Sequence, residues 1–93
     1  MNSQNKGSAV PQQFKVEVAF ARVAVAAFTY YPEKSVEEPG YVVDEDVEWA
    51  LEPIHEMDAA DLGYWRERVR AVISDPTADR RAFLGDFMAL AGA

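Results

Sequence analysis

Hydrophobic and polar positions alternate near the start of the chain. Every second residue from Phe14 to Phe20 is large and apolar, and the residues between them are Lys, Glu and Ala. A period of two places these four apolar groups on one face of a β-strand. The alternation slips by one residue at Ala21 and Arg22 and resumes at Val23, which indicates a bulge, a bend or a change of element. We therefore predict a bent strand or hairpin over residues 13–30.

The same region allows a second interpretation. Pro11 and Pro32 would also suit the two ends of one long helix over residues 12–31. The stretch from Ala24 to Tyr31 mixes alanines with aromatic residues and fits either element. The pattern thus leaves the choice between strand and helix open.

Helical periodicity is clearer in the last third of the chain. Asp58 is typical of a helix N-cap, and an inward stripe follows at spacings of three and four residues: Leu62, Trp65, Val69 and Val72. Asp75 and Pro76 predict a stop followed by the start of a new helix. The apolar residues beyond them share one helical face: Phe83, Leu84, Phe87, Met88 and Ala91. Residues 58–92 are predicted to form two antiparallel helices, and a short helix capped by Asp44 is predicted near residues 44–52.

These elements predict a small α+β domain. The expected architecture is an N-terminal strand or hairpin packed on a C-terminal helical hairpin, with the short acidic helix beside it. The alternative is an all-α bundle. Residues 1–11 are polar and small and are predicted to be a disordered tail, which leaves residues 12–93 as a single small domain. Exposed strand edges would favour a homodimer.

Composition narrows the function classes. The chain has 93 residues, no cysteine and a formal net charge of −7. The absence of cysteine excludes a disulfide scaffold, a thiol enzyme and a Cys-ligated zinc site. A sequence pI of about 4.5 argues against direct binding of DNA or RNA. The longest nearly uncharged stretch, residues 18–31, is too short to cross a bilayer, so we expect a soluble cytoplasmic protein.

The negative charge is concentrated in the middle of the chain. Residues 33–61 contain one lysine and eleven acidic residues, a net charge of −10, whereas residues 1–32 and 62–93 carry +2 and +1. N-caps and helix dipoles account for several of these acids, and a solubilising face accounts for others. The sharper interpretation is a docking surface for a basic partner. Its predicted partner-binding residues are Glu37, Glu38, Asp44, Glu45, Asp46, Glu48, Trp49 and Glu52.

A basic partner suggests a nucleic-acid-binding protein, because carboxylates can occupy sites that normally hold phosphates. In composition the chain is similar to small acidic phage or plasmid proteins that block host nucleases, CRISPR complexes or restriction enzymes. We therefore predict a non-enzymatic inhibitor or nucleic-acid mimic of the anti-CRISPR or anti-restriction type. The alternative is a homo-oligomeric structural or regulatory subunit whose acidic face keeps it soluble.

Catalytic and metal chemistry have weak support in the sequence. His55 is the only histidine, and it lies near Glu52 and Glu56, but the kink expected at Pro53 spoils a ligand register. One histidine and few hydroxyls give no nucleophilic triad. We predict no enzyme activity, no metal and no cofactor.

Overall fold

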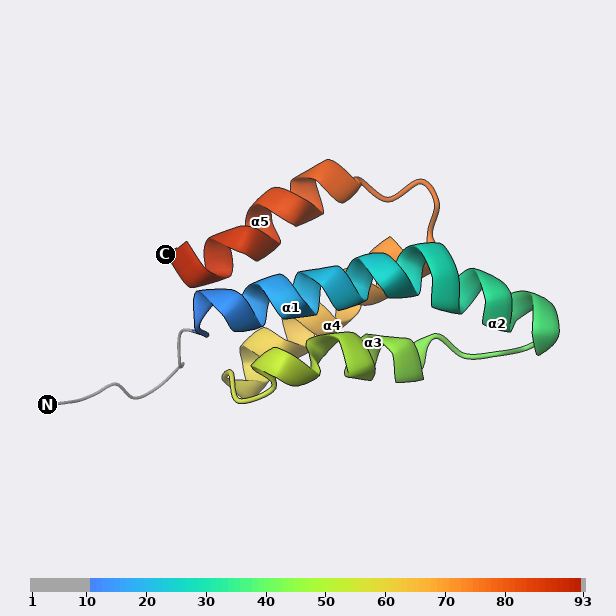
Figure 1. The fold of residues 1–93 in the computed structure, drawn as a ribbon, viewed down its shortest axis with the longest axis horizontal. Helices are drawn as coiled ribbons and strands as arrows, with labels where there is room; N and C mark the ends of the chain where they lie inside the picture. Colours follow the sequence, from blue (N-terminus) through green and yellow to red (C-terminus); the bar gives the residue numbers. More distant parts are fainter. Residues whose placement is uncertain (1–10, 93) are drawn as a thin grey trace, which may run out of the picture.

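The N-terminal half of the domain is one long helical rod. The computed structural model describes residues 11–92. Helix α1 (Gln13–Val25) continues into a π-helical turn, η1 (Ala26–Tyr30), and then into α2 (Tyr31–Glu37) without a break. Figure 1 shows this rod running along the molecule, with α2 extending past the other helices at one end.

The predicted α+β fold is wrong, and the all-α alternative describes the observed architecture. Residues 13–30 are helical, and residues 11–92 contain no strand. Five positions here are buried: Ala27, and a helical stripe of Val16, Ala19, Val23 and Ala26 that recurs at spacings of three, four and three. Two of the four stripe residues are alanines, whose small side chains make the helical period hard to recognise in the sequence. Phe14, a large apolar residue on which the strand prediction relied, is 59% exposed.

The π-helical turn explains how the rod continues through Pro32. Proline lacks an N–H and its ring clashes with the carbonyl four residues earlier, which breaks a regular α-helix. Here the Tyr31 N–H binds the carbonyl of Ala26, five residues back. This wider turn directly before Pro32 accommodates the proline, as π-bulges do in other helices. Pro32, Pro39 and Gly40 in the sequence predict a loop over residues 32–40. Instead residues 32–37 continue the helix, and the chain turns at Gly40, whose φ of 92° favours glycine.

Three further helices cover the rod. Helix α3 (Asp44–Leu51) ends in a 3₁₀ turn, η2 (Glu52–Ile54), and is followed by α4 (Ala59–Ser74) and α5 (Arg80–Gly92). Helices α3 and α5 both pack on α1, and α4 packs on α3. In Figure 1, α5 runs above α1 and returns toward the amino end of α1.

The helix starts agree with the sequence in part. The Asp58 carboxylate accepts the N–H of Ala60 at 3.1 Å, which confirms the predicted cap of α4. Asp44 lies inside the first turn of α3, after the cap residue Val43. The Asp75 carboxylate accepts the N–H of Thr77 in the turn after α4. Helix α5 begins only after Asp79, whose carboxylate accepts the N–H of Ala82 at 2.9 Å. The disordered tail was predicted over residues 1–11, of which residues 1–10 lie outside the described residues and Pro11 is buried.

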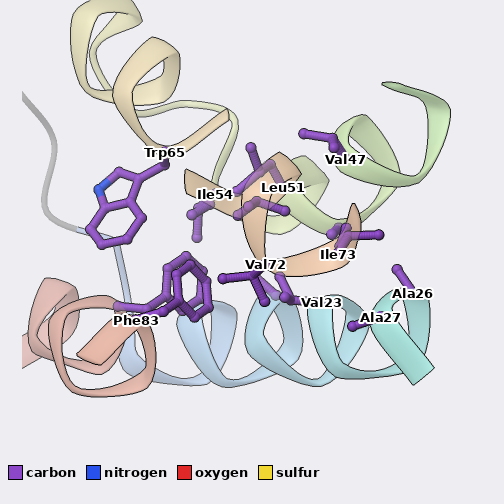
Figure 2. Packing of buried hydrophobic residues seen from close by; sticks show 14 of the residues in the cluster. Val23, Ala26, Ala27, Val47, Leu51, Ile54, Trp65, Val72, Ile73 and Phe83 are labelled. Atoms are coloured by element: carbon purple, nitrogen blue, oxygen red, sulfur yellow. The ribbon is translucent and has the colours of Figure 1, made fainter. Parts of the chain in front are cut away.

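One hydrophobic core joins the helices. Figure 2 shows Val23 of α1, Leu51 of α3, Val72 of α4 and Phe83 of α5 converging on it. At the edge formed by α5, the Phe83 and Phe87 rings stack at 5.1 Å, and Trp65 meets each ring edge to face. Such pairs contribute beyond their buried area and fix the place of α5.

Candidate interaction surface

The segment after the π-helical turn projects from the bundle and is here called the acidic arm, residues 31–42. It consists of α2 and the loop that leads to α3. No residue of α2 is buried, although every other α-helix with described burial contributes to the core. The arm carries Glu33, Glu37 and Glu38 against Lys34. Only Tyr31, at the start of α2, is partly buried against the core, so the arm offers its carboxylates on an element that is otherwise exposed.

Glu33, Glu37 and the adjoining Glu45 form no ion pair within residues 11–92, while Glu38 meets Lys34 at 3.5 Å. Because that pair is exposed and one helical turn apart, it neutralises Glu38 only weakly. Two of the eight predicted partner-binding residues, Glu37 and Glu45, are thus exposed carboxylates with no internal counterion in this part of the chain.

Three other predicted residues are paired with cations of neighbouring helices. Glu48 accepts from Arg66 at 2.5 Å, and Glu52 accepts from Arg22 at 2.7 Å. Asp44 is paired with Arg70. These bridges connect α3 to α4 and the following η2 turn to α1, so the three carboxylates have an internal role in the bundle. The central acidic stretch is consequently divided between paired carboxylates on α3 and unpaired ones on and beside the arm.

Glu56 and Lys15 make a further bridge at 2.9 Å between the segment after η2 and α1. The hydrogen bond from the Lys15 ammonium lowers the pKa of the Glu56 carboxyl. The ion pair with Glu48 likewise raises the pKa of the Arg66 guanidinium. Both shifts indicate that these carboxylates are held by the protein's own cations.

Asp46 faces inward. It is 7% exposed, its Oδ1 accepts a hydrogen bond from the Tyr41 hydroxyl at 3.3 Å, and its Oδ2 has no partner. Burial raises the pKa of the Asp46 carboxyl, because a charged group is less stable away from water. Burial and the neighbouring carboxylate also raise the pKa of Tyr41. Asp46 therefore belongs to the packing between the arm and α3.

Trp49 is partly buried and packs against the core. Its ring lies 4.9 Å from Tyr30 and 5.1 Å from the Arg22 guanidinium, which also donates to the Trp49 carbonyl at 2.9 Å. The predicted aromatic anchor is thus engaged inside the molecule. Val36 is the apolar residue most open on the arm, at 80% exposure, and the sequence reasoning missed it because a single valine among acids forms no stripe.

An apolar pocket lies between the rod and the start of α5. It has a volume of about 260 Å³ and is lined by Phe20, Val23, Ala24, Ala27, Phe28, Val72, Arg80, Arg81, Phe83 and Leu84. The Arg80 guanidinium lies 5.4 Å from the Phe28 ring and donates to the Val72 carbonyl at 3.1 Å. Its Nε is buried without a hydrogen-bond partner. The lining thus combines apolar side chains with two guanidinium groups.

These two arginines stand apart from the other cations of residues 11–92. The remaining six cations all form ion pairs, whereas Arg80 and Arg81 form none within that range. From the sequence, both residues belong only to a thin basic patch of the C-terminal helices, because Glu67, Asp75, Asp79 and Asp86 lie among its arginines. Their position at a pocket depends on how α5 crosses α1, which residue spacing does not encode.

Other chemistry has little structural support. Within residues 11–92 no cluster of three or more His, Cys, Asp or Glu side chains has the geometry to hold a metal ion. The Nδ1 atom of His55 lies 2.7 Å from the carbonyl of Glu52. No helix of the described segment is both long and apolar enough to cross a membrane. The chain matches no known family, no curated protein and no solved structure.

Proposed function

We propose that this chain is a non-enzymatic binding protein that docks through its acidic arm and Glu45 on a basic surface of a partner protein. The observation that carries the proposal is the arm itself. Helix α2 buries none of its residues, yet it holds two carboxylates, Glu33 and Glu37, and an 80% exposed valine, and a third carboxylate, Glu38, follows at its end. A seven-residue helix is marginal in isolation, and here it persists as the continuation of α1.

The chemistry of the arm selects the partner. Unpaired carboxylates favour lysines and arginines, and charge-assisted hydrogen bonds to such groups are the strong ones. An apolar residue among the charges, here Val36, can be buried at the centre of the interface and exclude water from it. The partner surface is therefore basic, with an apolar spot that receives Val36.

Nucleic-acid-binding proteins present basic surfaces of this kind. Carboxylates seated on their phosphate-binding residues would exclude DNA or RNA, so the proposed activity is inhibition by mimicry of the nucleic-acid backbone. The paired acids support this role indirectly. The bridges of Asp44 with Arg70 and of Glu48 with Arg66 fix α3 against α4, and so hold the helix that the arm leads into.

The test is capture of partners on the immobilised protein. The wild-type chain is compared with E33Q/E37Q/E45Q and with the control E17Q/D61N/E67Q, which removes the same amount of charge from exposed sites elsewhere. The screening length falls from about 10 Å in 0.1 M salt to about 3 Å in 1 M salt. We expect nucleic-acid-binding proteins to be retained at the lower salt concentration only, and to be lost from the arm variant but not from the control.

Addition of duplex DNA or RNA separates mimicry from simple charge attraction. Where the carboxylates occupy phosphate sites, the nucleic acid displaces the captured protein. Equal capture by the arm variant and the wild-type chain would overturn the proposed function. Capture that depends on the arm but resists nucleic acid would retain the docking surface and remove the mimicry.

A further inference from the structure

A stripe of exposed and partly exposed apolar residues runs along one side of the rod from α1 to α2. Its members recur every four residues: Phe20, Ala24, Phe28, Pro32 and Val36. On an ideal α-helix a four-residue step turns by about 40°, and the wider turn of η1 reduces this drift. The first three members line the apolar pocket, and the last two line a shallow hollow with Glu33 and Glu37. Phe28 and Val36 are 68% and 80% exposed.

The two halves of this stripe carry opposite charge. Arg80 and Arg81 flank the half on α1 and η1, and Glu33 and Glu37 flank the half on α2. None of the four forms an ion pair within residues 11–92. Each half of the stripe is therefore complementary to the other: both are apolar, and the arginines beside one half can pair with the glutamates beside the other.

We propose that the stripe pairs with the same stripe of a second copy, in an antiparallel, two-fold symmetric dimer. In a two-fold interface each contact occurs twice, because residue i of one copy meets residue j of the other and the reverse. A two-fold axis near Phe28 brings Val36 of one copy over the apolar pocket of the other. Glu33 and Glu37 then approach Arg80 and Arg81, and both halves of the stripe are covered.

A second copy fits this surface better than a small amphipathic acid. The pocket volume of about 260 Å³ is below the range of roughly 300–1,000 Å³ typical of sites for drug-sized ligands. A small acid would satisfy the arginines but leave Val36 and the two glutamates exposed. Residues 20–37 span about 27 Å as a helix, which is a narrow contact. We therefore expect a weak dimer, with a dissociation constant on the order of micromolar.

This inference rests on the proposed function in one respect, since both use the acidic arm. The dimer would cover the arm and compete with the basic partner. The arginine half belongs to the dimer alone, so changes there separate the two proposals. R80E/R81E removes self-association while the arm stays free to capture a partner.

Sedimentation velocity over a range of protein concentrations provides the test. We expect a concentration-dependent shift from monomer to dimer in the wild-type chain. Val36→Asp leaves the core intact, because the side chain is 80% exposed. It raises the dimer dissociation constant about 100-fold, as a loss of about tenfold occurs at each of two equivalent contacts. The control Glu17→Lys leaves the equilibrium unchanged.

Mixing two charge-swapped chains tests the pairing itself. R80E/R81E and E33R/E37R should each remain monomeric, because like charges then face one another. An equimolar mixture should form a heterodimer, although both chains remain net negative. A monomeric wild-type chain at all concentrations would overturn the inference, as would a dimer indifferent to Val36→Asp. Circular dichroism confirms folding of each variant, and R81E alone replaces the double change where Arg80 is needed for folding.

Discussion

The aromatic cluster between α4 and α5 gives the most direct check on the packing that forms the apolar pocket. Phe87 is fully buried, stacks on Phe83 at 5.1 Å and meets the Trp65 ring at 5.2 Å. Truncation of a buried phenylalanine to alanine costs about 3–5 kcal/mol, because apolar transfer is lost and a cavity remains. A chain of this length has a total stability of about 5–14 kcal/mol, so Phe87→Ala removes a large part of it.

The assay is urea unfolding followed by circular dichroism, with Phe87→Leu as the matched control. Leucine keeps most of the volume and should cost less than about 1.5 kcal/mol. The dependence of the unfolding free energy on urea should be unchanged, since the surface exposed on unfolding is the same. On heating, Phe87→Ala should lower the midpoint by about 12 °C or more. A loss below about 1 kcal/mol would refute the placement of α5 against α4.

Three smaller changes follow from single residues. The wild-type chain should gain stability relative to Asp46→Asn as the pH falls, because the Asp46 pKa is higher in the folded than in the unfolded chain and folding therefore takes up a proton. Chemical unfolding of both chains from pH 7 to pH 4 measures the difference in their unfolding free energies, and a difference that does not change with pH contradicts the prediction. Gly85→Ala should stabilise by about 0.5–1 kcal/mol, because open space surrounds this helical glycine; a destabilised variant contradicts this. Gly40→Ala should destabilise by about 1–2 kcal/mol, because φ is 92° there, and an unchanged thermal midpoint would contradict that strain.

The sequence predicts the C-terminal helices well and the N-terminal element badly, for physical reasons. The stripe of Leu62, Trp65, Val69 and Val72 is large, regular and introduced by a cap, so one interpretation dominates. In α1 the inward positions include Ala19 and Ala26, while Phe14 and Val18 are exposed. The large apolar residues recur with the period of a strand, whereas the buried helical positions include small residues. Only the tertiary contacts of the two alanines show that this segment is a helix.

The candidate surface was predicted in composition but not in detail. Charge counting locates the acids in residues 33–61, yet it cannot tell that Glu48 and Glu52 face Arg66 and Arg22 on other helices. It also cannot find the burial of Asp46, which depends on how the loop returns Tyr41 to the start of α3. The arm was predicted as a loop because Pro32 argues against a helix. The π-helical turn that accommodates this proline leaves no clear mark in the sequence.

Hydrogen exchange of the α2 backbone amides tests the central claim most directly. No residue of α2 is fully buried in the free chain, so its amides should exchange faster than those of α1 and α4 in dilute protein. Addition of a protein captured by the wild-type chain but not by the arm variant should slow exchange in residues 31–42. If α2 already exchanges as slowly as α4 in dilute protein, or exchanges at the same rate with and without that partner, the arm is not the binding element.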